Sequence, residues 1–113
     1  MERETSNQIL ITNQFLIIFK EKYGVRKYTV RVLKKCEKKI NQLPEKDINT
    51  LVMLLEDIEQ YGPVQPKYQN FSKIGKNKYH CHLSYHWVAC WQEFENEFYV
   101  EVYYVGSREN APY

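Results

Sequence analysis

The sequence predicts an α+β fold: an N-terminal strand and a helical hairpin packed on one face of a small, mainly antiparallel sheet of four to five strands. Two features of the apolar pattern carry this prediction. Apolar residues follow a helical spacing between residues 33 and 62, and from Tyr68 onward they recur at every second position. When helices precede a run of strands, they cover one face of the sheet and leave the other face available for function.

The N-terminal part of the chain contains one ambiguous segment and one clear strand. Residues 6–24 fit an amphipathic helix that ends at Gly24, but Ile9 to Ile11 would serve equally well as the start of a strand. Residues 28–33, with the sequence YTVRVL, alternate and are rich in β-branched side chains. That composition predicts the first strand of the sheet.

A helical hairpin is predicted after this strand. Residues 33–43 place Leu33, Cys36, Ile40 and Leu43 at helical spacing. Pro44 interrupts the pattern and suits the first position of the next helix, and Gly62 supplies its stop. This second helix has one apolar stripe, formed by Ile48, Leu51, Val52, Leu55 and Ile58.

Four short aromatic or β-branched runs follow and predict an antiparallel meander. They read YQNFSKI, KYHCHL, WVACWQEF and FYVEVYYV, at residues 68–74, 78–83, 87–94 and 98–105. Turn-forming residues separate the runs, which agrees with hairpin connections between neighbouring strands.

Charge is balanced over the whole chain, with 16 Lys and Arg against 14 Asp and Glu, but one segment is cationic. Residues 62–92 contain no acidic side chain and hold Lys67, Lys73, Lys76 and Lys78. A local cationic surface suits an anionic partner that docks on one face. A solvated, lysine-rich turn would give the same pattern.

The three cysteines form no disulfide framework, and free thiols fit a reducing cytoplasm. The start of the chain is polar and acidic, and the apolar run after it is short and broken. We therefore expect no signal peptide, no membrane span and a cytoplasmic protein.

Histidines gather in residues 78–91, KYHCHLSYHWVACW. On a strand, Lys78, His80 and His82 share one face, while the apolar alternate residues face the helices. Two imidazoles about 7 Å apart along a strand suit a proton donor and acceptor near neutral pH. Phosphodiester chemistry or RNA contact is therefore one interpretation of this pair.

Two other interpretations of the histidines stay open. They can be surface or hydrogen-bonded structural residues. They can also supply two ligands of a zinc site, but such a site needs a third or fourth ligand. His86 or a distant carboxylate would have to provide it, because Cys81 points to the opposite face. The many aromatic residues after Tyr68 add modest support for RNA, since exposed rings stack on bases, although most of these rings are expected in the core.

Two segments resemble the RelE/ParE superfamily of bacterial toxins. Residues 30–63 resemble its strand–helix–helix opening, and residues 100–113 resemble its closing strand and tail, in which a Val-Gly-x-Arg-Glu word follows the last strand. The resemblance covers about residues 27–113. It therefore divides the chain into an N-terminal extension, residues 1–25, and a RelE/ParE-like toxin domain, residues 26–113.

The resemblance implies a function. RelE-type members are cytoplasmic toxins that cleave messenger RNA in the ribosomal A site without a metal, and a cognate antitoxin neutralises them. We therefore expect a ribosome-dependent endoribonuclease, or mRNA interferase, that inhibits translation, needs no cofactor and has an antitoxin partner. ParE-type members share the fold and poison DNA gyrase, so the alternative is a non-enzymatic ParE-like toxin or an orphan binding module.

The resemblance also implies site residues. The family's final arginine matches Arg108, its C-terminal tyrosine matches Tyr113, and His80 and His82 occupy slots that hold alternating lysines in RelE-type enzymes. Val88 stands where the family has an arginine, which departs from the pattern, as does the weak net charge. The predicted catalytic residues are thus His80, His82, Arg108 and Tyr113, and the predicted RNA contacts are Lys73, Lys76, Lys78, His86 and Trp91, with no metal ligand.

Overall fold

A computed structural model describes residues 27–95 and 97–113, so the predicted extension and its ambiguous segment lie outside the described residues. The elements are, in order, β1 (Thr29–Val32), the 3-10 helix η1 (Lys34–Cys36), α2 (Glu37–Gln42), α3 (Glu45–Tyr61), β2 (Gln69–Gly75), β3 (Lys78–His82), β4 (Trp87–Phe94), β5 (Tyr99–Ser107) and the 3-10 helix η2 (Arg108–Asn110). None of the helices in this part of the chain is long and apolar enough to span a membrane.

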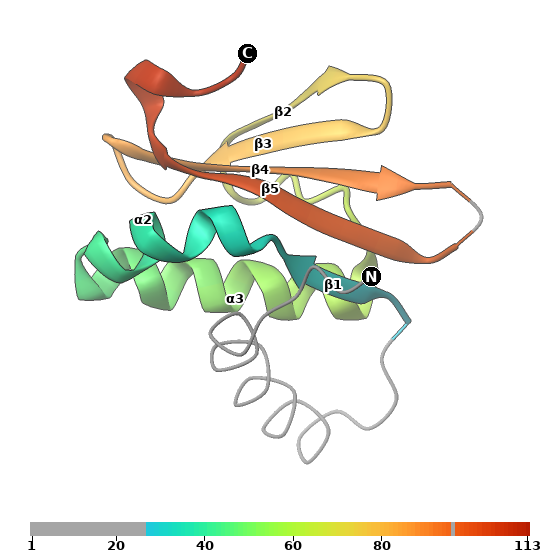
Figure 1. Cartoon of the computed structure of the whole chain (residues 1–113). Coiled ribbons are helices and arrows are strands. Elements are labelled where there is room, and N and C mark those ends of the chain that lie inside the picture. Colours follow the sequence, from blue (N-terminus) through green and yellow to red (C-terminus); the bar gives the residue numbers. More distant parts are fainter. Residues whose placement is uncertain (1–26, 96) are drawn as a thin grey trace.

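The five strands form one sheet in the order β1-β5-β4-β3-β2. β1 pairs with β5 in parallel, and the other neighbouring pairs are antiparallel. Helices α2 and α3 lie on one side of the sheet, and the chain after β5 lies on the other side (Figure 1). The predicted α+β class, helical hairpin and mainly antiparallel sheet are therefore confirmed, with one parallel pair that makes the sheet mixed.

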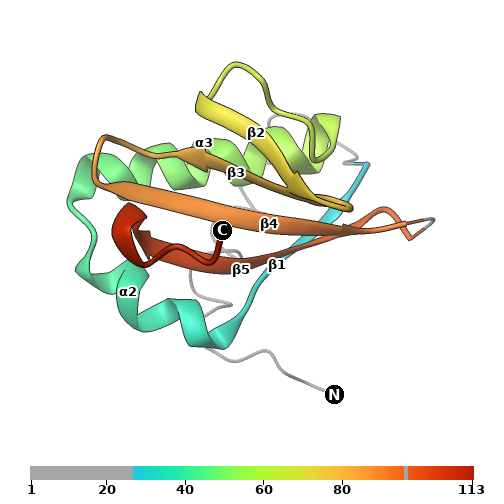
Figure 2. The same cartoon turned by 90° about the horizontal axis from the view of Figure 1, so that it is seen from above.

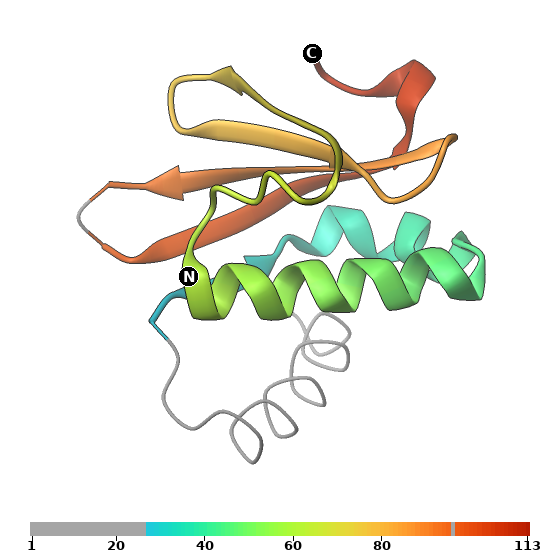
Figure 3. The same ribbon diagram turned by 180° about the vertical axis from the view of Figure 1, so that it is seen from behind.

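Helix α3 begins and ends where the sequence predicts. Pro44 is its N-cap, and Glu45 and Asp47 in its first turn complement the positive end of the helix dipole. Gly62 has a φ of 100°, which favours glycine, and its N–H donates to the Ile58 carbonyl at 2.8 Å. Viewed from behind, α3 runs along the underside of the sheet (Figure 3), so its apolar stripe faces the strands.

The hydrophobic core lies between this helical layer and the sheet. Trp91 in β4 has no exposed surface, and its indole N–H donates to the Pro63 carbonyl at 2.9 Å. Phe71 and Tyr79 pack beside the indole, with centroid distances of 6.1 and 6.3 Å. The prediction that Trp91 contacts RNA is therefore wrong, because its ring is enclosed on the helix side of the sheet.

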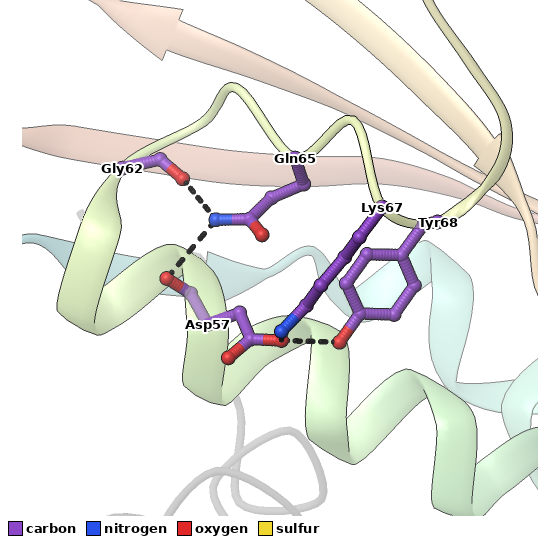
Figure 4. A network of polar contacts seen from close by, with 5 residues as sticks. All are labelled: Asp57, Gly62, Gln65, Lys67 and Tyr68. Carbon is purple, nitrogen blue, oxygen red and sulfur yellow. Dashed lines mark hydrogen bonds and ion pairs between the residues drawn. The ribbon is translucent and has the colours of Figure 1, made fainter.

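A polar network fixes the connection from α3 to the edge strand β2 (Figure 4). The Gln65 amide donates to the main-chain carbonyls of Asp57 and Gly62, at 3.1 and 2.9 Å. The Tyr68 hydroxyl donates to the Asp57 carboxylate at 2.5 Å, and the Lys67 ammonium lies 3.0 Å from the same oxygen. These contacts anchor the chain directly before β2, which carries two residues of the candidate site.

Candidate functional site

The histidine pair lies on the face of the sheet that the helices leave uncovered, called the uncovered face below. Tyr79, Cys81 and Leu83 belong to the core, as the strand alternation predicts, so His80 and His82 point away from the helices. The sheet register places His80 beside Ser72 of β2 and Cys90 of β4. Seen from above, the segment after β5 lies over the middle strands on this same face (Figure 2).

Both imidazoles are held through their Nδ1 atoms. His80 Nδ1 lies 3.1 Å from the Ser72 hydroxyl, and His82 Nδ1 lies 3.4 Å from the Asn70 amide nitrogen. Because an amide nitrogen only donates, this contact assigns the neutral His82 proton to Nε2. The Ser72 hydroxyl can donate or accept, so it permits either tautomer of His80. The ring centroids of the two histidines are 5.7 Å apart.

The C-terminal segment covers the pair. The Tyr113 ring lies over His80 with a centroid distance of 4.3 Å, and the two histidines are only 7% and 9% exposed. Burial lowers the pKa of His80, with the neighbouring His82 adding to the effect and a hydrogen bond to the Ser72 main chain opposing it. Burial also lowers the pKa of His82, and the Arg108 guanidinium lowers it further. Both imidazoles therefore favour the neutral form more than a solvent-exposed histidine does.

Arg108 approaches the pair from the start of η2. Its main-chain N–H donates to the His86 carbonyl at 2.9 Å, which ties η2 to the turn between β3 and β4. Its guanidinium lies over the Tyr85 ring, 4.4 Å from the centroid, and donates to the Tyr85 hydroxyl at 3.0 Å. Both contacts of the guanidinium are with one exposed residue, Tyr85.

These groups line one open hollow of about 500 Å³. Its lining residues are Asn70, His80, His82, Arg108, Glu109 and Tyr113. All four residues predicted as catalytic therefore meet in one place, although they come from β3 and from the segment after β5. Two imidazoles, a guanidinium and a phenol around such a hollow can bind a phosphate and move protons to and from it.

The residues predicted as RNA contacts lie outside this hollow. Lys73 pairs with Tyr79, and paired residues share a face, so Lys73 lies on the helix side. Lys73 therefore does not share a face of the sheet with His80 and His82. Lys76 lies in the turn between β2 and β3, and the Lys78 ammonium lies 5.9 Å from the Tyr103 ring centroid. The exposed ring of His86 packs against Tyr85.

Several contributors to the site were missed from the sequence. Asn70, Ser72 and Tyr85 hold the predicted catalytic groups, but each sits in a stretch that reads as an ordinary strand or turn. Asn70 gives a weak signal, since asparagine is enriched at positive φ, and its φ is 54°. Val88, which stands where the family has an arginine, has no exposed surface and pairs with His82 and Gly106. Arg108 is therefore the one arginine or lysine among the lining residues of the hollow.

The zinc interpretation finds no further ligands in the described part of the chain. Within residues 27–95 and 97–113, no group of three or more His, Cys, Asp or Glu side chains converges as a metal site would require. Cys81 lies in the core on the opposite face from the histidines. Among these described residues, His80 and His82 therefore belong to no group that could hold a metal ion.

Comparison with known proteins gives a structural likeness. No protein-family model and no curated protein matches the sequence. The archaeal RelE–RelB complex from Pyrococcus horikoshii OT3 contains a similar chain, with a TM-score of 0.61 and 17% identity, over 75% of this chain and 99% of that chain. The conserved hypothetical protein HP0892 from Helicobacter pylori is similar over 73% of this chain and 96% of its own, with a TM-score of 0.51 and 22% identity. The chain therefore shares its fold with these two structures.

Proposed function

We propose that this protein is a RelE-like toxin that cleaves messenger RNA on the ribosome without a metal, by attack of the RNA's own 2′-hydroxyl. One observation carries the proposal: His80, His82, Arg108 and Tyr113 meet in a hollow on the uncovered face of a RelE/ParE fold. Such a reaction requires in-line geometry, a base, an acid and positive charge beside the phosphate. The hollow supplies the last three groups.

The bonds change as follows. The 2′-oxygen forms a bond to phosphorus while the bond from phosphorus to the 5′-oxygen breaks. The base takes the proton of the 2′-hydroxyl, and the acid gives a proton to the departing 5′-oxygen. The products are a 2′,3′-cyclic phosphate and a 5′-hydroxyl, so atoms and charges balance without a metal or an added nucleophile. Arg108 stabilises the phosphorane-like transition state through paired N–H donors.

The hydrogen bonds at Nδ1 favour one assignment of the two histidines. If His80 donates its Nδ1–H to Ser72, its Nε2 lone pair is free to accept the 2′-hydroxyl proton. His82 is then the acid: its imidazolium donates at both ring nitrogens, so Nε2–H faces the departing oxygen and the Asn70 amide turns its oxygen toward Nδ1. The lowered pKa of His80 keeps the base neutral, and the lowered pKa of His82 makes its imidazolium a stronger acid.

Tyr113 defines how the substrate reaches this pair. Its half-exposed ring lies on His80, so a nucleotide has to replace that contact or extend the stack. Stacking of a base on an exposed aromatic ring contributes about 1–3 kcal/mol, which is enough to offset the lost contact. We assign Tyr113 to base stacking or to assistance of the leaving group.

An antitoxin partner, ribosome-bound messenger RNA as substrate, and a cytoplasmic location belong to the same proposal. One solved structure with a similar fold is a complex of RelE with RelB, which supports a protein partner for this chain. The uncovered face of the sheet is the surface on which such a partner would block the hollow.

A second candidate function is a non-enzymatic toxin of the ParE type or an orphan binding module. Two observations favour it. Val88 fills the position where the resemblance places an arginine, and both histidines are nearly buried. In that case the histidines hold the C-terminal segment in place, and the exposed surface of the fold, rather than the hollow, recognises the target.

Induction of the gene alone, followed by mapping of RNA 5′ ends and of DNA breaks, separates these functions. The proposal expects growth arrest with new 5′-hydroxyl ends inside coding regions. Induction of the His82→Ala variant under the same conditions should produce none of these new ends. Growth arrest with intact RNA, with or without DNA breaks, would reject the nuclease and support the non-enzymatic toxin.

A further inference from the structure

A second hollow of about 260 Å³ lies beside the first, between β5 and the η1–α2 segment. Its lining residues are Lys35, Cys36, Lys39, Tyr103, Tyr104, Val105 and Pro112. We propose that this hollow is a subsite for one nucleotide of single-stranded RNA adjacent to the cleaved linkage, with Tyr103 stacking on the base and Lys35 and Lys39 contacting phosphate. This inference rests on the proposed function, since it extends the path of the same substrate.

A β-bulge creates the aromatic wall. Along β4 and β5, Trp91 pairs with Val102 and Cys90 pairs with Tyr104, so Tyr103 has no partner on β4. Val102 and Val105 on either side are buried in the core. The extra residue therefore places two consecutive tyrosines outside the core, although strict alternation would bury one of them.

The two tyrosines make different contacts. The Tyr104 hydroxyl donates to the Ser107 carbonyl at 2.7 Å. Its ring crosses Gly106 so closely that a Cβ there would lie 2.7 Å from the hydroxyl oxygen. Tyr104 thus forms a fixed wall. Tyr103 is half-buried and has the Lys78 ammonium 5.9 Å from its centroid, so one cation already lies beside the ring that we assign to stacking.

Two lysines form the opposite rim. β1 ends at Val32, so the part of β5 beyond Val102 faces η1 and α2 instead of a strand. Lys35 and Lys39 are four residues apart, which places them on the same side of this helical segment, and both are exposed. Sites for single-stranded nucleic acid combine exposed positive charge with an aromatic ring, as Lys35, Lys39 and Tyr103 do here.

The two hollows adjoin neighbouring residues of the C-terminal segment. Pro112 lines the second hollow and Tyr113 lines the first, and consecutive Cα atoms are about 3.8 Å apart. An RNA strand whose scissile phosphate lies beside His80 therefore has a neighbouring nucleotide within reach of Tyr103. This adjacency places the second hollow beside the proposed cleavage site, which favours RNA over an acidic protein segment as the occupant.

Equilibrium binding of a short, fluorescein-labelled RNA with 2′-O-methyl groups at every position tests the subsite, because this probe cannot be cut. Removing both lysines in Lys35→Ala/Lys39→Ala should reduce the slope of log affinity against log salt by about 1.4, since each phosphate contact on a single strand contributes about 0.7. Lys46→Ala removes an exposed lysine from α3 and should leave the slope unchanged.

Tyr103→Leu should weaken binding roughly 5- to 100-fold, as loss of one stacked base does, while Tyr103→Phe should bind as the wild type does. Thermal unfolding of each variant verifies that it is folded. An unchanged slope and affinity in the lysine and leucine variants would overturn the subsite. Displacement of the RNA by a glutamate-rich peptide, with stronger binding of that peptide than of RNA, would instead assign the hollow to an acidic protein.

The outcome is distinguishable from failure of the proposed function. If the wild type binds the probe through Lys35, Lys39 and Tyr103 but does not cut natural RNA, the nuclease fails and the RNA subsite stands. If the wild type cuts RNA and the three substitutions change neither binding nor the KM for messages, the subsite fails and the nuclease stands.

Discussion

The Tyr113 ring lies over the His80 ring, with centroids 4.3 Å apart and planes inclined by 44°. This contact joins the segment after β5 to β3 and closes the candidate site over one imidazole. It removes water from His80, and burial is the largest cause of the lowered pKa of that group. The same two residues thus connect the packing of the chain end with the protonation state on which the proposed chemistry depends.

The pH dependence of cleavage follows from the histidine pKa values. In the proposed mechanism the base is neutral and the acid is protonated, and the pKa of each imidazole is lowered from 6.5. The profile of kcat/KM, which reports the free enzyme, should therefore be bell-shaped with its centre below pH 6.5. Steady-state cleavage between pH 4.5 and 8.5 measures it. Tyr113→Ala exposes the His80 ring and should therefore move the acidic limb of the profile, which reports His80, toward higher pH. An unchanged profile would contradict the claim that Tyr113 lowers the pKa of His80.

Folding stability should fall in mild acid through the same pair. The folded pKa values of His80 and His82 lie below the value of about 6.5 in the unfolded chain, so below that pH the unfolded state binds more protons. The contribution of these two histidines to the free energy of unfolding is complete above pH 6.5. It is lost as the pH falls from there through the folded pKa values. Urea unfolding at pH 7.5 and pH 5.0 measures this change.

The control is the double variant His80→Gln/His82→Gln, in which neither position titrates. Its free energy of unfolding should change less between the two pH values than that of the wild type, since neither position then loses a proton on folding. An equal change in both proteins would show that the two rings do not lose protons on folding.

Gly106→Ala should destabilise the protein by about 1–3 kcal/mol, as overpacking does. Its new Cβ would lie 2.7 Å from the Tyr104 hydroxyl oxygen and 2.9 Å from the ring carbon beside it. Gly75→Ala is the matched control in β2, because its Cβ meets the Lys78 side chain at an ordinary 3.6 Å. Chemical denaturation compares the two; equal effects would mean that Tyr104 moves aside without cost.

The network before β2 should depend on Asp57 far more than on Lys67. Asp57→Ala leaves the Tyr68 hydroxyl without its acceptor and should cost about 1–3 kcal/mol. Lys67→Ala removes an ion pair whose lysine is 65% exposed and should cost about 0–1 kcal/mol. Both values come from urea unfolding. A larger loss in the lysine variant would show that the ion pair, not the hydrogen bond, anchors this connection.

Periodicity predicted most of the fold, because the main elements each have one dominant spacing. Pro44 and Gly62 mark the ends of α3, and the four aromatic runs correspond to β2 through β5. The alternation in β3 also separated His80 and His82 from the core side chains. These inferences need only local geometry, since the positions of Cβ atoms on a strand or helix follow from its period.

Long-range contacts and irregular pairing limited the prediction of the site. Both sides of WVACW are apolar, so the pattern does not show that Trp91 faces the core. The register shifts between β2 and β3 decide where Lys73 points, and the bulge in β5 decides where Tyr103 points. The chain end packs on His80 through Tyr113, which lies 33 positions later in the sequence. No local spacing predicts such a contact.

The most direct test of the account is single-turnover cleavage of ribosome-bound messenger RNA by the purified full chain and by His82→Ala, with chemical identification of the new ends. The account predicts cuts that leave a 2′,3′-cyclic phosphate and a 5′-hydroxyl, at a rate about 10²–10⁴ times lower in the variant. Intact RNA with the wild type, or equal rates for the two proteins, would contradict it.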